Sequence, residues 1–187
     1  MSEINTLAGD TVGTPAAEAA AEITFADLGV APAASWARMW MRVVQVDQAD
    51  DVIVLQLGRG GTGPAGRQQQ IFVNGYEVAS DGFVAGGLVT TLRYPLDAGW
   101  HLLELGWEGV GTSAGARELF VDGAPVGRDE GLDFSWPQTL QELNVGETYA
   151  DLPFRGVIDF DDVRLSYAPP ASRLTLAPGS GQLTVGR

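Results

Sequence analysis

The chain has 187 residues, which fits one domain with short arms, and 45% of them are hydrophobic, enough for a buried core. Its formal net charge is −13, and all 11 basic residues are arginine. So few cations in an acidic chain argue against nucleic acid as a partner and against docking on anionic membranes. Because the sequence has no cysteine, disulfides and thiolate chemistry are excluded.

Residues 1–22 contain few large hydrophobic side chains and are expected to form an N-terminal arm. This segment lacks the basic and apolar regions of a secretory signal. The sequence also has no apolar stretch of about 20 residues, so we expect no membrane insertion. We therefore expect a location on an extracellular surface reached by another route, or in a virion.

From residue 23 onward the hydrophobic pattern has a period of two. In SWARMWMRVVQV, one set of residues alternates strictly with another: Trp36, Arg38, Trp40 and Arg42 with Ala37, Met39, Met41 and Val43. This alternation predicts a strand whose aliphatic face lies in the core and whose Trp/Arg face points away from it.

Two hairpins are predicted further along the chain. QQQIFVNGYEVAS is expected to turn at Asn74-Gly75 and ARELFVDGAPVG at Asp122-Gly123, because these dipeptides tolerate the positive φ of tight hairpin turns. Other strands are predicted in DVIVLQLG, LVTTLRYPL, GWHLLELGWEGVG, TLQELNVGE and GVIDFDDVRLSY. The segment GRGGTGPAGR is expected to be a loop, because it lacks the Gly-Lys-Ser/Thr ending of a phosphate-binding loop.

About eight to ten short strands without a long helical period predict an all-β chain, an antiparallel two-sheet β-sandwich of the jelly-roll type. We expect the arm at 1–22, the jelly-roll domain at 23–167, and a Pro-rich linker with a C-terminal hairpin or arm at 168–187.

Three segments occur in an order that is typical of a known family. They contain Trp100-His101, then Val121-Asp122-Gly123, then LPFRGVIDFDDVRLS. Together they resemble the laminin G-like module of the concanavalin A-like lectin/glucanase jelly-roll superfamily over residues 95–167, with Phe160-Asp161 as two extra residues in the last motif. The resemblance implies recognition of sugars, proteins or surfaces, in some members through calcium.

The last motif also decides whether the glucanase chemistry of that superfamily is expected. Its retaining glucanases use two glutamates on one strand as nucleophile and acid/base. Here Val157 stands at the nucleophile position and Asp162 at the acid/base position. Because valine cannot attack an anomeric carbon, we expect no hydrolysis of β-glucans and no enzymatic activity.

The same motif predicts an irregular strand. Ile158 and Phe160 share one parity while Val163 and Leu165 share the other, and a regular strand cannot place both pairs on one face. A β-bulge near Asp161–Asp162 would restore the register.

Two interpretations of the carboxylates in this motif stay open. They are solvated or bonded within a turn, or Asp159, Asp161 and Asp162 form a calcium site with a carbonyl from a neighbouring loop. No other cofactor is expected. His101 is the only histidine and lies in mid-strand, so we expect a structural role for it rather than a catalytic or metal-binding one.

The Trp/Arg face, formed by Trp36, Arg38, Trp40 and Arg42, is the candidate ligand-binding surface. Aromatic planes stack on sugar rings and guanidinium groups donate forked hydrogen bonds, although Arg–Trp stacking can also be purely structural. We expect a non-enzymatic, lectin-like module that binds a surface glycan or protein. The alternative is a structural or decoration protein of a virion, such as a bacteriophage head or tail component, whose arms contact further copies or virion neighbours. An enzyme acting on glycosides is the third candidate.

Overall fold

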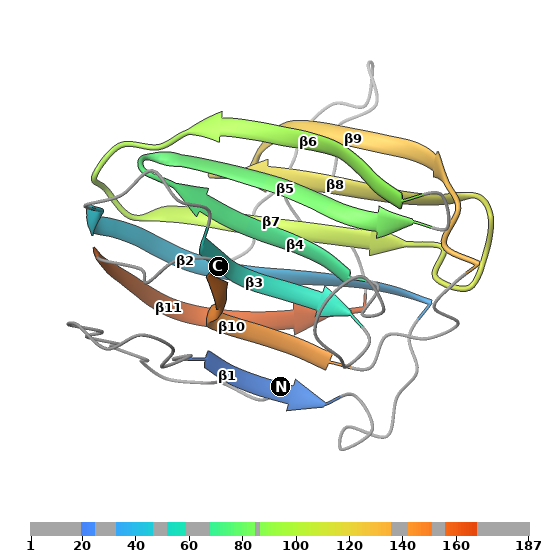
Figure 1. The fold of residues 1–187 in the computed structure, drawn as a ribbon, viewed down its shortest axis with the longest axis horizontal. Coiled ribbons are helices and arrows are strands. Elements are labelled where there is room, and N and C mark those ends of the chain that lie inside the picture. The colour runs from blue at the N-terminus through green and yellow to red at the C-terminus, as the bar shows by residue number, and fades with distance from the viewer. Residues whose placement is uncertain are drawn as a thin grey trace, which may run out of the picture.

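The protein is an antiparallel β-sandwich. The computed structural model describes residues 20–24, 33–46, 52–58, 68–84, 87–135, 142–150 and 156–167. This part of the chain forms eleven strands and contains no helix, and the strands lie in two layers (Figure 1). The predicted fold class is therefore confirmed. No helix that could cross a membrane is found among the described residues.

The two sheets have six and five strands. The six-stranded sheet has the order β1 (Ala20–Thr24), β10 (Glu142–Ala150), β3 (Val52–Gly58), β4 (Gln68–Asn74), β5 (Glu77–Val84) and β6 (Gly87–Pro95). The five-stranded sheet has the order β11 (Gly156–Ser166), β2 (Ala34–Val46), β7 (His101–Glu108), β8 (Gly115–Val121) and β9 (Ala124–Leu132). The boundary expected between arm and domain, at residues 22 and 23, falls inside β1.

The core lies between the sheets, and β2 presents its aliphatic face to it. The side chains of this face are at most 1% exposed: Ala37, Met39, Met41 and Val43. On the neighbouring strand β7, Trp107 is fully buried and packs edge-to-face against Phe134, with 5.4 Å between the ring centroids. The prediction that the Met/Val side of β2 is core is confirmed.

Both predicted hairpins are present, one of them with a shifted turn. Asp122 and Gly123 have φ of 53° and 76° and connect β8 to β9, as the sequence predicts. The β4–β5 turn instead comprises Gly75 and Tyr76, because Asn74 pairs with Glu77 as the last residue of its strand. Gly75, with φ of 59°, then occupies the first turn position, where a two-residue hairpin favours glycine.

The predicted bulge in β11 is also confirmed. The register against β2 shifts between Asp161 and Arg164, and Asp162 has a positive φ of 47°. The extra residue lets both Ile158 and Val163 reach the core, which resolves the conflict of parity in the sequence. Three other predicted regions lie outside the described residues: arm residues 1–19, the glycine-rich loop from residue 59 to 67, and the C-terminal segment 168–187.

Candidate functional site

The candidate surface is the outer face of the five-stranded sheet, the side turned away from the core. Strand β2 contributes Trp36, Arg38, Trp40 and Arg42 to it, because these residues alternate with the buried aliphatic ones. Antiparallel pairing with β11 and β7 brings residues distant in sequence beside them. The face divides into two ends that differ in exposure.

The buried end of this face comprises Trp36, Gly106, Glu118 and Arg128, which lie in one row across β2, β7, β8 and β9. Trp36 is only 5% exposed, and its Nε1 donates a hydrogen bond of 3.2 Å to Oε1 of Glu118. A Cβ on Gly106 would lie 2.5 Å from Trp36 Nε1, so the indole lies directly over this glycine. The expectation that Trp36 is open to a ligand is therefore wrong, because its ring is packed against its own sheet.

Arg128 holds three strands together at the buried end. Its Nη1 and Nη2 donate bonds of 3.0 Å to Glu118 on β8 and to Glu108 on β7, and its Nε donates a 2.7 Å bond to Glu130 on β9. The bond to Glu108 is the largest cause of a raised pKa for Arg128, which keeps the guanidinium charged. The row thus has a structural function.

Between the two ends, the bulge in β11 engages Arg38. Asp162 accepts a bond of 3.2 Å from Arg38 Nη2 and one of 2.6 Å from Arg164 Nε. The bond from Arg164 is the main cause of a lowered pKa for Asp162. Burial opposes it, and the bond from Arg38 adds to the lowering. The bulge therefore aims a carboxylate at two arginines, and this carboxylate is ionised at neutral pH.

The exposed end comprises Trp40, Arg42, Trp100 and Asp159, where β7 begins and its pairing with β2 stops. Trp100 is 41% exposed, and the guanidinium carbon of Arg42 lies 5.1 Å from the centroid of its ring. Asp159 pairs with Arg42 in register and accepts bonds from its Nε, at 3.1 Å, and from its Nη2. Trp40 is partly exposed. An aromatic ring, a cation and a carboxylate are thus adjacent on an open surface.

His101 fixes the start of β7 directly after Trp100. Its Nδ1 lies 2.8 Å from Oδ2 of Asp122, and its Nε2 lies 3.2 Å from Oδ1 of Asp97. The second oxygen of Asp122 accepts a bond of 2.9 Å from the amide of Leu102. Burial lowers the pKa of His101, but the bonds to Asp122 and Asp97 together outweigh it, so that the pKa is raised. His101 thus connects the strand to the β8–β9 turn, which agrees with the structural role expected for it.

The three aspartates predicted as a calcium site do not have a suitable arrangement. Asp159 and Asp162 are paired with arginines, and Oδ1 of Asp161 accepts a bond of 2.7 Å from the amide of Asp162. Among the described residues no three His, Asp or Glu side chains are placed to share a metal ion. These carboxylates as arranged do not fit calcium, and calcium binding by the chain stays an untested prediction.

Trp100 belongs to the candidate surface but is not among the residues predicted from the sequence. Its signal is parity, since Trp100 alternates with His101 and shares its side of the strand with Leu102. What the sequence does not provide is the register, in which His101 pairs with Met41 and so places Trp100 beside Arg42.

Comparison with known proteins finds a similar fold in solved structures but no match by sequence. No family model and no curated protein matches the sequence. Among solved structures, the endo-β-1,4-glucuronan lyase of the fungus Trichoderma reesei is similar, with a TM-score of 0.55 and 16% identity over 80% of this chain and 74% of the lyase chain.

Toxin binding domains form a second group of similar structures. The botulinum neurotoxin DC binding domain in complex with SialylT has a TM-score of 0.59 and 6% identity, over 91% of this chain and 43% of that chain. The serotype D ligand-binding domain in complex with N-acetylneuraminic acid has a TM-score of 0.52 and 6% identity, over 74% of this chain and 34% of that chain. This chain therefore matches less than half of each toxin domain.

These similarities show that the protein shares its β-sandwich fold with the lyase and the toxin binding domains, while no family model confirms the resemblance to the laminin G-like module. At 6% and 16% identity they show a common fold, and they do not transfer a ligand or an activity to this chain.

Proposed function

We propose that the protein is a non-enzymatic carbohydrate-recognition module that binds a surface glycan at the exposed end of the five-stranded sheet. The observation that carries the proposal is the exposed Trp100 beside the Arg42–Asp159 pair. The similarity to toxin domains whose structures contain sugars is consistent with it, because a common fold permits such a function without requiring it.

The chemistry of the exposed end suits sugar binding. The apolar faces of a pyranose ring stack on an indole ring, while the sugar hydroxyl groups need both donors and acceptors at their edges. Arg42 supplies N–H donors and Asp159 supplies carboxylate acceptors, and their ion pair holds both side chains in place before a ligand arrives. Such preorganisation reduces the entropy that binding must overcome.

The non-enzymatic part of the proposal rests on Val157 and Asp162. Val157, at the position of a glucanase nucleophile, pairs with Gln45 at an irregularity of β11. Asp162, at the acid/base position, is bound to Arg38 and Arg164, and its lowered pKa leaves no proton to donate to a leaving group at neutral pH. Retaining hydrolysis needs both groups.

An array of immobilised neutral and acidic glycans tests the proposal, with Trp100→Ala as the diagnostic variant. We expect the wild-type chain to be retained on a subset of the glycans. Trp100→Ala should weaken this retention by about 2 kcal/mol, or about 30-fold, because aromatic anchors dominate recognition surfaces. Its unfolding midpoint in urea should stay near that of the wild type, since Trp100 lies outside the core.

Tyr167→Ala is the matched control. Tyr167 is 46% exposed, similar to Trp100, and follows the strand end at which Ser166 pairs with Trp36. Trp36 is six residues from Arg42 along β2, or roughly 20 Å, so Tyr167 lies far from the exposed end. Equal losses in both variants, or no retention of the wild type on any glycan, would contradict the proposal. A Trp100→Ala chain that loses self-association but keeps glycan retention would instead favour the virion assembly function.

A further inference from the structure

Each arginine that β2 and β11 contribute to the candidate surface is bonded to an aspartate. Arg42 is paired with Asp159, and Arg38 and Arg164 are both bonded to Asp162, while Asp161 is exposed beside them. The three arginines and three aspartates have a formal charge of zero. Each guanidinium that faces solvent here therefore already has a carboxylate next to it.

An acidic sugar would have to compete with these internal partners. A ligand carboxylate would either displace Asp159, which would lose the bonds it accepts from Nε and Nη2 of Arg42, or bind the remaining N–H donors of the same guanidinium. In the second case two carboxylates would share one cation at close range. A sugar hydroxyl group has no such cost, since it can accept from the guanidinium and donate to the carboxylate of an intact pair.

The charge of the rest of the molecule also disfavours an acidic ligand. Its net charge of −13 creates a negative potential that opposes the approach of any anion at low ionic strength. Within the described residues, Arg93 is paired with Glu77, Arg117 with Asp129, and Arg128 with three glutamates. These arginines too have acidic partners, so they do not reverse the repulsion locally.

We infer that the glycan bound at the exposed end is neutral and is recognised through hydroxyl groups rather than through carboxylate or sulfate groups. This inference rests on the proposed function and names its substrate class. It distinguishes this chain from two proteins of similar fold that are described with acidic sugars, one with glucuronan and the other with N-acetylneuraminic acid.

Two matched pairs of sugars test the inference by calorimetry. Cellohexaose and the β-1,4-linked hexamer of glucuronic acid differ only at C6, and lactose and sialyllactose differ by one sialic acid. We expect the neutral member of a bound pair to bind about tenfold more tightly or better at about 20 mM NaCl, where charge repulsion is least screened. The difference should narrow at about 150 mM NaCl.

Asp159→Asn tests the mechanism, because it releases Arg42 from its carboxylate partner. This variant should bind the acidic member about fivefold more tightly than the wild type does. It should bind the neutral member more weakly, because the amide keeps only one of the two acceptor oxygens. Glu130→Gln is the control, since it removes the same charge from the outer edge strand β9, three strands from β2, where the side chain is 71% exposed.

The outcomes distinguish the inference from the proposed function. Tighter binding of the acidic member by the wild type would overturn the inference and leave glycan recognition standing. A gain in acidic binding that is equal in Asp159→Asn and Glu130→Gln would also overturn it, because the effect would then come from net charge alone. Failure to bind any of the four sugars, together with an empty glycan array, would overturn the proposed function and the inference with it.

Discussion

The two ends of the same sheet face use the same residue types for different purposes. At the buried end, Trp36 lies over Gly106 and donates to Glu118, and it is almost completely covered. At the exposed end, Trp100 has 41% of its surface open and is contacted by Arg42 from one side. In both places a tryptophan adjoins an arginine–carboxylate pair.

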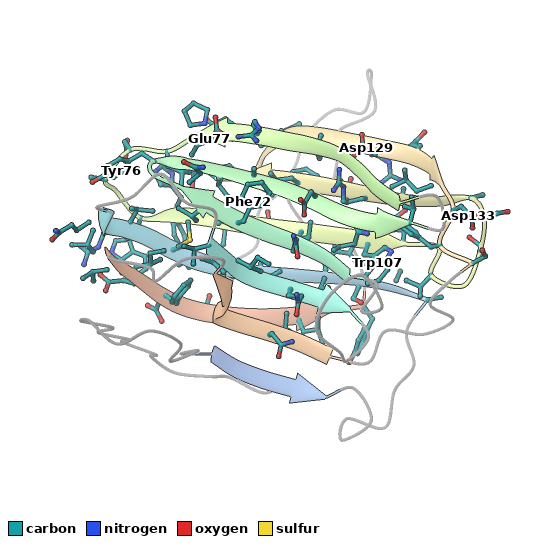
Figure 2. The ribbon with its side chains drawn as sticks, viewed as in Figure 1. Phe72, Tyr76, Glu77, Trp107, Asp129 and Asp133 are labelled. Carbon is teal, nitrogen blue, oxygen red and sulfur yellow. The ribbon has the colours of Figure 1, made fainter. Side chains whose placement is uncertain are left out.

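The difference between the two ends arises from the neighbouring strands. Gly106 has no side chain, so the indole of Trp36 can lie over the backbone of β7 and reach β8. Trp100 instead precedes β7, at the end of the central strand of the sheet, where the chain leaves the loop after Pro95. Figure 2 shows Tyr76 and Glu77 at one end of the sandwich and Asp133 at the other.

Trp36→Ala should have the largest effect on stability. Removing a buried tryptophan leaves a cavity and breaks the hydrogen bond to Oε1 of Glu118, and such changes cost about 3–5 kcal/mol. Urea unfolding measures this loss, and glycan retention by the variant that remains folded should be close to that of the wild type. Trp40→Ala, which truncates a partly exposed ring, should cost at most about half as much. Equal costs for the two variants would show that the division into ends is wrong.

Gly106→Ala should have the second largest effect. The new Cβ would lie 2.5 Å from Trp36 Nε1 and 2.9 Å from Glu118 Cγ, so one of the two side chains must move. Such overpacking costs about 1–3 kcal/mol. In a Trp36→Leu background most of that cost should disappear, because the side chain in conflict is shorter, and a double-mutant cycle measures the difference. A cost that is unchanged in this background would locate the strain elsewhere.

Much of the fold could be predicted from local patterns. The alternation in β2 gives the buried side of Met39 and Met41, and the conflict between Ile158 and Val163 gives the bulge. Asp122-Gly123 gives a hairpin turn whose positive φ values the structure contains. These features depend on neighbours along the chain, for which the sequence provides direct information.

The candidate site could be predicted only in part, because it depends on contacts between distant strands. Trp36 and Glu118 are 82 residues apart, and Arg42 and Asp159 are 117 apart. Parity places Trp36 and Trp40 on one face, but it does not indicate that a glycine lies under the first of them. It also does not indicate that the aspartates of β11 face arginines of β2, which is why a calcium site looked reasonable in the sequence.

The smallest predicted effect concerns pH, and it again separates the two ends. At the buried end the strands are connected by Arg128, which stays charged. At the exposed end the start of β7 is fixed by His101, which titrates. Because the pKa of His101 is raised on folding, its bonds to Asp122 and Asp97 add stability that is fully present below about pH 6.5, the unfolded value, and is lost as pH rises through the folded value. The chain should therefore unfold at a lower urea concentration at about pH 8.5 than at about pH 5.5.

Asp97 and Asp162 have lowered pKa values and titrate below this range, so they do not contribute to the difference. His101→Gln should remove the pH dependence between these two values, and a dependence that persists in this variant would assign it to another group.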